Sequence, residues 1–262
     1  MKKFVCILMA LILLAVLAYS LWQIMDIVTE YRGGTDSYAE LDQYVAMPEP
    51  QVAEPTETEE TFTETDEEEV PLVYVESPEV DFEALAQINS DIVGWLYVPD
   101  TVINYPIVQG VDNNYYLNHL FNGKTNSSGC IFLDYGAQSD FTSMNSVLHG
   151  HHMRNGSMFA GICKYKTQSY YDEHPTAVLV TPDGKYLVRF FAGYVCKDSS
   201  DAWNYSFAPE DHQAWLDERM SLSVFETDVV PTTEDRILTL STCTYEFKDA
   251  RFVLHGILVP AV

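Results

Sequence analysis

The sequence predicts a mainly β domain, folded as a closed or nearly closed barrel and preceded by one transmembrane helix. An uncharged apolar run over residues 4–25 predicts the helix, and many short β-rich runs after residue 92 predict the barrel. An acidic stretch separates the two. We therefore divide the chain into a cytoplasmic tip and anchor (1–30), an acidic disordered spacer (31–80) and a globular domain (81–262).

The anchor is predicted from its length and its flanking charges. Residues 4–25, at about 1.5 Å per residue, are long enough to cross a hydrocarbon core of about 30 Å. Lys2 and Lys3 precede the run and acidic side chains follow it, so the positive-inside rule places the N-terminus in the cytoplasm and the later domain outside the cell. A cleaved signal peptide with a processing site near Ala18 is the alternative, but the apolar run continues to Met25.

The expected spacer is strongly acidic. Residues 49–81 carry 13 Asp and Glu side chains, and no Lys or Arg occurs from residue 33 to residue 123. Such a segment buries too little apolar surface to offset the entropy lost on ordering, and its charges repel one another. A solvated acidic face of a folded element is the alternative, but no helical or strand period runs through the segment. We expect it to be disordered and to extend the reach of the globular domain from the membrane.

The overall charge and the cysteine count exclude several function classes. The chain has 14 basic and 39 acidic side chains and a formal net charge of -25, so it lacks the clustered Lys and Arg that nucleic-acid binding requires. Its five cysteines include no C-x-x-C pair that would indicate a zinc or redox motif. Their spacing matches no disulfide framework, and we expect no disulfide.

The globular domain begins with a helix and continues with short strands and turns. Helical spacing predicts a helix over residues 82–88, and turn chemistry ends it at residues 89–91. A late helix is predicted over residues 209–220, because proline is favoured in the first turn and apolar residues follow at helical spacing. A turn is predicted at residues 182–184. The β-rich runs cover residues 92–98, 103–108, 130–134, 146–151, 177–181, 186–196, 236–243 and 252–259.

Chemistry is expected at Cys243, which ends one of the predicted strands. Strand alternation puts Leu238 and Leu240 on one face and Cys243 on the other, so the thiol leaves the leucine-lined face. A buried structural cysteine is the alternative. Arg251 starts the next strand, and a hairpin would return it beside Cys243, where a guanidinium favours a thiolate or binds a developing oxyanion.

A thiol nucleophile also needs a proton partner, and histidine is the residue whose titration fits. His149, His151 and His152 lie close together in the sequence. A metal site is the alternative, but strand alternation separates His152 from the other two, and no nearby carboxylate completes a ligand set, so we expect no metal. We interpret the four isolated histidines as surface or packing residues: His119, His174, His212 and His255.

Taken in order, these motifs resemble those of the sortases, and specifically those of class B sortases. The resemblance is carried by Thr239-Leu240-Ser241-Thr242-Cys243, by Arg251 and by the segment over residues 145–153. Supporting stretches lie at residues 93–95, 104–109, 112–117 and 129–134. The similarity runs from about Asp81 to the C-terminus and leaves the anchor and the spacer uncovered.

The resemblance implies a sortase-type β-barrel with N-terminal helices and a helix in the loop before the catalytic-cysteine strand, which matches the predicted helix over residues 209–220. It also implies Cys243 as the nucleophile, His151 as the general acid and base, and Arg251 as the stabiliser of the oxyanion and the bound backbone. In the family the residue before the glycine of the histidine motif is commonly Tyr, whereas here it is His149. His149 therefore stays an alternative proton partner.

The activity implied by the resemblance is that of a cysteine transpeptidase, which is also a peptidase. The Cys243 thiolate would attack the carbonyl of a Thr in a C-terminal sorting signal, and His151 would protonate the departing amine. A peptidoglycan or lipid II amine would then attack the thioester and link the surface protein to the cell wall. The implied partners are sorting-signal peptides, the amine acceptor and, through the N-terminal helix, the cell membrane. No cofactor is required.

Four further residues are candidates for substrate contact by the same resemblance. Asn113 and Leu117 lie in a segment similar to the groove wall of class B enzymes. Tyr205 lies in the loop before the late helix, and Ser241 shares the outward strand face with Cys243. Each has an alternative interpretation as a turn or packing residue.

Three other functions stay open from the sequence. Within the same chemistry, the enzyme could instead polymerise pilins with a Lys amine as the acceptor. A papain-like peptidase also pairs Cys with His, but there the Cys usually precedes the His, whereas here it follows. The third function is that of a non-catalytic, membrane-anchored binding domain. Reaction with a thiol-directed probe that is lost in Cys243→Ala would argue against it.

Overall fold

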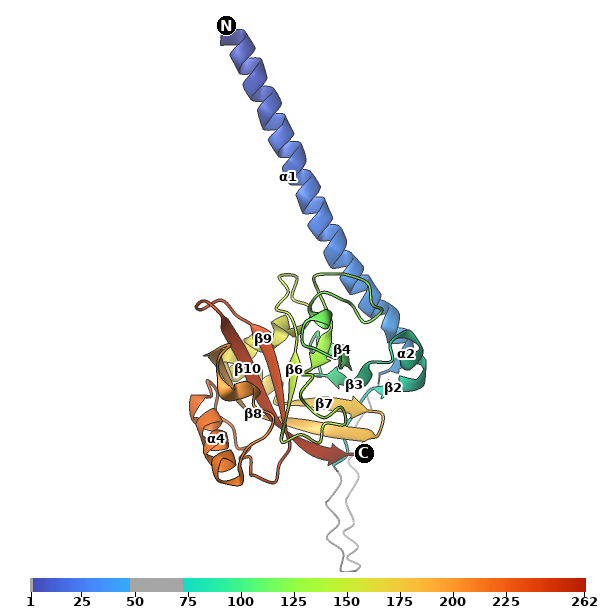
Figure 1. The fold of residues 1–262 in the computed structure, drawn as a ribbon, viewed down its shortest axis with the longest axis vertical. Helices are drawn as coiled ribbons and strands as arrows, with labels where there is room; N and C mark the ends of the chain where they lie inside the picture. The colour runs from blue at the N-terminus through green and yellow to red at the C-terminus, as the bar shows by residue number, and fades with distance from the viewer. Residues whose placement is uncertain (1, 48–72) are drawn as a thin grey trace, which may run out of the picture.

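Eight strands form a closed barrel in the order β10-β8-β7-β3-β4-β5-β6-β9 (Figure 1). This computed structural model describes residues 2–47 and 73–262. The predicted mainly β barrel is confirmed, and each barrel strand falls on one of the β-rich runs of the sequence. The strands are β3 (Ile92–Tyr97), β4 (Asn104–Val108), β5 (Ile131–Leu133), β6 (Asn145–His149), β7 (Thr176–Thr181), β8 (Gly184–Lys197), β9 (Ile237–Cys243) and β10 (Ala250–Ala261).

Parallel pairing occurs at two places in this mostly antiparallel barrel. β4 pairs in parallel with β5, and β6 pairs in parallel with β9. Leu238 and Leu240 of β9 join the main hydrophobic core with Phe252 and Leu254 of β10. Thr239 lies between the two leucines and is buried against polar side chains instead. The alternation predicted for this strand therefore sets which side chains enter the core and which face away from it.

The two predicted helices of the globular domain are present. α2 (Phe82–Ile88) begins after Asp81, whose carboxylate accepts a hydrogen bond from the Ala84 amide at 2.9 Å. α4 (Pro209–Leu222) carries proline in its first turn and packs Trp215 into a hydrophobic cluster with residues of β8, β9 and β10.

Several short helical segments were not predicted. A one- or two-turn segment has no long hydrophobic period of its own, so its shape depends on what it packs against. In the longest of them, Phe159, Ile162 and Tyr165 are fully buried in the main core. The segments are η2 (Tyr115–Leu117), η3 (Phe159–Lys166), α3 (Gln168–Glu173) and η4 (Asp201–Trp203).

The N-terminal helix is longer than the apolar run that predicted it. α1 (Lys2–Ala39) has 38 residues and includes a window long and apolar enough to cross a membrane by length and composition. Figure 1 shows its N-terminal part extending away from the barrel. Its C-terminal part, from Glu30 onward, contacts the barrel domain. The Tyr38 ring packs edge-on against Tyr105, and the following η1 (Glu40–Tyr44) buries Leu41.

The expected spacer boundaries at residues 31 and 80 differ from the structure. Part of that range is folded on the barrel, and β1 (Val45–Ala46) pairs with β2 (Glu79–Val80). The acidic composition of the range hides its apolar contacts: Leu41 is buried, and Tyr31, Tyr38 and Tyr44 are partly buried against the core. The middle of the expected spacer, residues 48–72, lies outside the described residues. Because β1 and β2 are paired, Ala46 and Glu79 lie side by side, so the number of residues between them does not separate α1 from the barrel.

Leu41→Ala in the full chain is expected to destabilise the barrel by about 2 kcal/mol or more, because Leu41 packs in a buried cluster with Leu85 and Trp95. The measurement is the denaturant midpoint of the detergent-solubilised protein, followed by tryptophan fluorescence. Val111→Ala is the matched control, since the Val111 side chain is 95% exposed. Equal midpoints for the two variants would show that the N-terminal segment adds nothing to the barrel core.

Candidate active site

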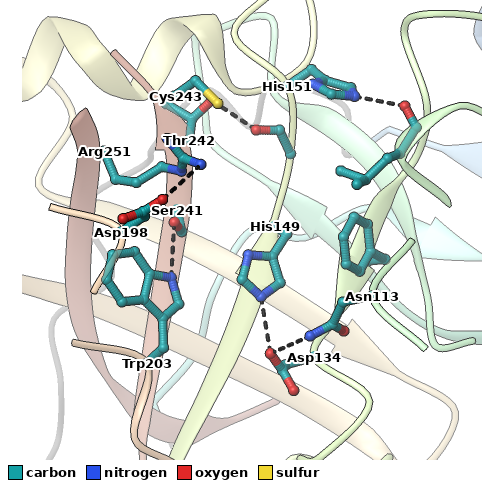
Figure 2. Close-up of a pocket in the computed structure, with 13 residues that line it drawn as sticks. Asn113, Asp134, His149, His151, Asp198, Trp203, Ser241, Thr242, Cys243 and Arg251 are labelled. Carbon is teal, nitrogen blue, oxygen red and sulfur yellow. Dashed lines mark hydrogen bonds and ion pairs between the residues drawn. The ribbon is translucent and has the colours of Figure 1, made fainter. Parts of the chain in front are cut away.

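A pocket opens on the barrel where β6 and β9 end and β10 begins (Figure 2). The segment around η2 and the loop after β8 complete its walls. Three residues singled out in the sequence for catalysis, Cys243, His151 and Arg251, line this pocket together. The fold thus brings side chains from three separate stretches of sequence to one place.

Cys243 is the last residue of β9 and lies opposite Arg251 in the antiparallel register with β10. The hairpin expected from the sequence is therefore present. The hydroxyl of the preceding residue, Thr242, donates a hydrogen bond to the carbonyl oxygen of Gly150 at 2.7 Å. This bond ties the end of β9 to the segment that follows β6.

Three other cysteines, Cys130, Cys163 and Cys196, lie in settings that disfavour the thiolate. Burial raises the pKa of Cys130 to about 12 and that of Cys196 to about 11, and it also raises the pKa of Cys163. Because the thiolate is the nucleophilic form, burial makes these thiols weaker nucleophiles than an exposed cysteine. Of the cysteines whose side chains the structure describes, Cys243 is the one that lines the pocket.

His151 follows β6 after Gly150, and its Nε2 lies 2.6 Å from the carbonyl oxygen of Leu117 (Figure 2). A carbonyl oxygen only accepts hydrogen bonds, so Nε2 carries the proton of the neutral ring. Nδ1 is then the basic nitrogen. The contact with Leu117 therefore leaves Nδ1 available for proton transfer in the pocket.

The third histidine of the motif binds the main chain of Cys243. Nδ1 of His152 donates a hydrogen bond to the carbonyl oxygen of Cys243 at 2.9 Å and lies 3.5 Å from the Cys163 sulfur. The ring also lies beside Tyr245. Its separation from His149 and His151, expected from strand alternation, is observed, but its contact with Cys243 was not predicted.

The Arg251 guanidinium is directed by one main-chain carbonyl and one acid. Nη1 donates a hydrogen bond to the Ala250 carbonyl oxygen at 3.1 Å, and Nη2 lies 4.0 Å from a carboxylate oxygen of Asp198 in the loop after β8. Both side chains are partly exposed, so this ion pair adds little to stability. The pair with Asp198 limits the orientations of the Arg251 guanidinium, and Arg251 lies opposite Cys243.

A second imidazole on the pocket wall is paired with a carboxylate. Nε2 of His149 lies 3.1 Å from Oδ2 of Asp134, which also accepts a hydrogen bond from the Asn113 amide at 2.7 Å. The Gly136 amide donates to Oδ1 at 2.9 Å. Burial alone would raise the pKa of Asp134, but the hydrogen bonds from His149, Gly136 and Asn113 outweigh it and lower the pKa below its ordinary value. Asp134 is therefore a carboxylate at neutral pH.

Three of the four residues predicted to contact substrate line the pocket: Asn113, Leu117 and Ser241. Tyr205 is not among the residues that line it. A Cβ atom at Gly136 would come within 2.9 Å of the Tyr205 ring, so this ring lies against the loop after β5.

Other lining residues were not identified from the sequence as site residues. Asp134 is in a stretch that supported the resemblance, and an acidic residue at the end of a strand was the signal available. Trp203 donates a hydrogen bond from its indole to the Ser241 hydroxyl at 3.1 Å. Neither Trp203 nor Asp198 carried a local signal, because both lie between β8 and α4, in a connection with only the short η4, far from β9 in sequence.

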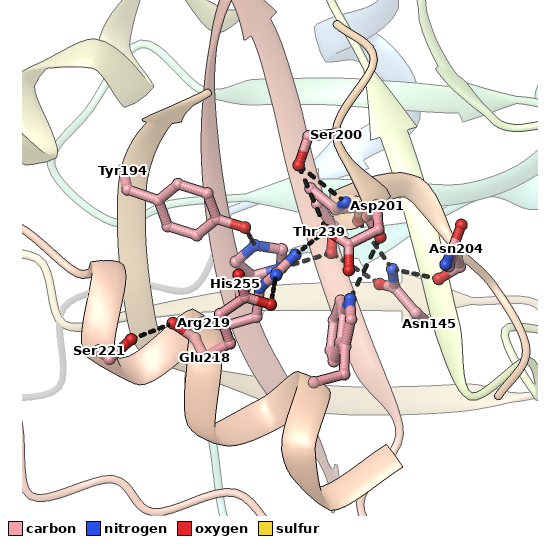
Figure 3. Close-up of polar contacts among 12 residues, drawn as sticks. Asn145, Tyr194, Ser200, Asp201, Asn204, Glu218, Arg219, Ser221, Thr239 and His255 are labelled. Carbon is pink, nitrogen blue, oxygen red and sulfur yellow. Dashed lines mark hydrogen bonds and ion pairs between the residues drawn. The ribbon is translucent and has the colours of Figure 1, made fainter. Parts of the chain in front are cut away.

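A buried polar network holds this loop from behind (Figure 3). The Thr239 hydroxyl donates to Asn145 at 2.6 Å and accepts from Nδ1 of His255 at 2.7 Å, while Nε2 of His255 accepts from the Tyr194 hydroxyl at 3.1 Å. The Asn145 amide donates to the two main-chain carbonyls that flank Trp203, at 3.1 and 2.8 Å. β6, β9 and β10 thereby set the position of the pocket wall.

Comparison with known proteins identifies the family of this fold and pocket. The family model described as Sortase domain matches residues 96–259. The chain belongs to the sortase family. Two curated relatives are each named Sortase B. The relative from Listeria monocytogenes is 37% identical over 179 residues, which cover 67% of this sortase and 72% of the relative. The relative from Staphylococcus aureus is 37% identical over 163 residues, which cover 62% and 67%.

Solved structures agree with this assignment. The Staphylococcus aureus sortase B-substrate complex has a TM-score of 0.66 at 35% identity, and the match covers 69% of this sortase and 85% of that chain. Sortase B from Bacillus anthracis in complex with AAEK1 has a TM-score of 0.71 at 28% identity, with 89% and 100% covered. The class B resemblance is confirmed, and this sortase is a cysteine transpeptidase.

Acidification is expected to destabilise this sortase through His255. Burial lowers the pKa of His255 from 6.5 to about 3. In the window between these values the unfolded chain binds a proton that the folded chain does not, so the free energy of unfolding falls as the pH falls through it. Denaturant midpoints at about pH 7 and about pH 5 measure the effect, and the difference should be smaller in His255→Gln. The same difference in both proteins would contradict this account.

Proposed function

We propose that this sortase cleaves a C-terminal sorting signal after a Thr residue and joins the released surface protein to a peptidoglycan or lipid II amine. The observation that carries the proposal is the convergence of Cys243, His151 and Arg251 in one pocket. These residues supply a nucleophile, a proton carrier and a fixed cation. The solved sortase B-substrate complex from Staphylococcus aureus, to which this chain is similar, supports a substrate-binding role for this fold.

In the first half of the reaction the Cys243 thiolate attacks the Thr carbonyl carbon. Negative charge then develops on the carbonyl oxygen, and Arg251, opposite Cys243 across the β9–β10 pair, donates hydrogen bonds to it. When the C–N bond breaks, the protonated Nδ1 of His151 gives its proton to the departing amine. The product is a thioester between Cys243 and the surface protein.

In the second half an acceptor amine attacks the thioester carbon. The C–S bond breaks, Cys243 leaves as a thiolate, and Nδ1 of His151 takes a proton from the attacking nitrogen. The thiolate and the imidazolium are thereby restored for the next cycle. The chemistry needs no cofactor.

The sorting signal would bind along the wall that Asn113, Leu117 and Ser241 provide. Asn113 and Ser241 present polar groups, and the half-exposed Leu117 presents an apolar surface. Such a mixture suits a peptide, whose main chain needs hydrogen-bond partners and whose side chains need shaped contacts.

We also propose that α1 anchors this sortase in the cell membrane as a single pass, with the N-terminus in the cytoplasm and the barrel outside. The apolar window of α1 and the flanking Lys2 and Lys3 support this orientation. In this arrangement residues 1–30 form the tip and the anchor, and the catalytic domain over residues 81–262 receives substrates at the outer face of the membrane.

His151→Ala is expected to reduce the transpeptidation rate by about 100-fold or more, the usual effect of losing a general acid and base. The measurement is the rate at which a labelled sorting-signal peptide is transferred to an added amine. His174→Ala is the matched control, because His174 lies outside the pocket. If His151→Ala stays active and His149→Ala does not, the assignment of the proton carrier to His151 is wrong.

Arg251→Lys is expected to lose nearly as much activity as Arg251→Ala. Lysine keeps the positive charge but lacks the planar donor fork that can bind an oxyanion and a main-chain carbonyl together. The comparison uses kcat/KM of the two variants in the same transfer assay. Near-complete activity in the Lys variant would mean that charge alone is the contribution of Arg251, and the assigned hydrogen bonds to the oxyanion would be rejected.

A further inference from the structure

Two protons must leave the acceptor nitrogen in the second half of the reaction. An alkylammonium group loses one proton to become a nucleophile, and the nitrogen loses another when it becomes an amide. The proposed mechanism gives the second proton to His151 and leaves the first without a receiver. The inference below rests on the proposed function and concerns that first proton.

His149 is a second imidazole in the same pocket. It ends β6 and lies opposite Ser241 in the parallel register with β9. Cys243 lies two residues beyond Ser241 on the same face of β9, so about 6.6 Å along the strand separates Cys243 from Ser241. Figure 2 shows the His149 ring inside the pocket, with Nε2 directed at Asp134.

The pairing with Asp134 determines which nitrogen of His149 is basic. A carboxylate only accepts hydrogen bonds, so Nε2 of His149 carries the proton and Nδ1 carries the lone pair. Among residues 2–47 and 73–262, no hydrogen-bond partner of Nδ1 is found. Nδ1 of His149 therefore has an unused lone pair, and the His149 side chain is 22% exposed.

Asp134 is held in place by groups other than His149. The Asn113 amide and the Gly136 main-chain amide each donate to it, and the side chain is only 13% exposed. A fixed carboxylate beside Nε2 stabilises the imidazolium that forms when Nδ1 takes up a proton. The His149–Asp134 pair is therefore suited to accept a proton at Nδ1 of His149.

The charges that face the pocket also favour a cationic acceptor. Asp134 and Asp198 contribute two carboxylates, and Arg251 contributes one guanidinium, whose nearest acid is Asp198. With His149 and His151 neutral and Cys243 acylated, the pocket carries a net negative charge. An ammonium group is attracted to such a pocket, and a proton on His149 is tolerated there.

We propose that His149, oriented by Asp134, takes the first proton from the ammonium group of the acceptor. The proton moves from the acceptor nitrogen to Nδ1 of His149, and the nitrogen gains the lone pair with which it attacks the thioester of Cys243. The C–S bond then breaks, and the second proton moves to His151. His149 returns its proton to solvent before the next acceptor binds, so protons and charges balance over the cycle.

Two acceptor amines of different basicity test this assignment. Ethylamine is an ammonium ion at neutral pH and must lose a proton before it attacks, whereas hydroxylamine is mostly unprotonated and does not. The experiment measures, for the full-length sortase in detergent, the rate of transfer of the same peptide to each amine. In His149→Phe the ratio of the ethylamine rate to the hydroxylamine rate is expected to fall about tenfold or more. A change in acylation or folding alters the transfer rates to both amines by the same factor and therefore cancels in their ratio.

Asp134→Asn is a second variant that keeps the imidazole. An Asn amide can donate to Nε2 of His149 and place the ring proton on Nδ1, which then cannot accept another, so the ratio is expected to fall here too. His174→Phe is the matched control and should keep the wild-type ratio, because His174 lies outside the pocket. An unchanged ratio in both pocket variants, or equal losses with both amines, would overturn the role of His149. Absence of any acyl-enzyme in the wild-type protein would instead overturn the proposed function.

Discussion

The pairing of β9 with β6 on one side and with β10 on the other is the constraint on which the site depends. In the register with β10, Arg251 lies opposite Cys243, and in the register with β6, His149 lies opposite Ser241. A shift of one residue in either pairing would turn these side chains to the other face of the sheet. Leu238 and Leu240 resist that shift, because it would carry them out of the core. The apolar residues of β9 thus fix where its polar residues lie.

Each histidine of the motif has a hydrogen-bond partner that determines which ring nitrogen carries the proton when the ring is neutral. Leu117 accepts from Nε2 of His151, Asp134 accepts from Nε2 of His149, and the carbonyl of Cys243 accepts from Nδ1 of His152. Two of the rings therefore keep Nδ1 basic, and the third donates from it. Histidines in one short segment can thus take different parts: we propose proton transfer for His149 and His151, while His152 binds the main chain of Cys243.

The barrel and the cysteine hairpin could be predicted from the sequence because their signals are local. Alternation within residues 237–243 and a short return to Arg251 are patterns of neighbouring residues. The contacts of Asp134 with His149 and of Trp203 with Ser241 could not be predicted in this way, since they join residues 15 and 38 positions apart through the closed barrel. The folding of residues 31–47 was missed for another reason, because a few buried side chains outweigh the acidic character of the range that contains them.

The continuous α1 changes how the anchor and the enzyme relate. A disordered spacer would let the barrel move away from the membrane, whereas α1 continues from its apolar window to the Tyr38 contact without a break. The carbonyl oxygen of Glu30 accepts a hydrogen bond from the Asn126 side chain at 2.8 Å, only a few residues after the apolar run ends. The barrel is therefore held close to the end of the apolar run, and if α1 spans a membrane as proposed, this helix sets the distance between membrane and barrel.

The most direct test of the central claim is the mass of the enzyme caught between the two half-reactions. The full-length protein is mixed with a sorting-signal peptide that contains Thr, without an amine acceptor, and is quenched in acid for intact-protein mass spectrometry and peptide mapping. The account predicts an adduct equal to the peptide up to and including the Thr, located on Cys243, absent from Cys243→Ala and discharged by an added amine. Cleavage by the Cys243→Ala variant, or an adduct on a residue other than Cys243, would contradict it.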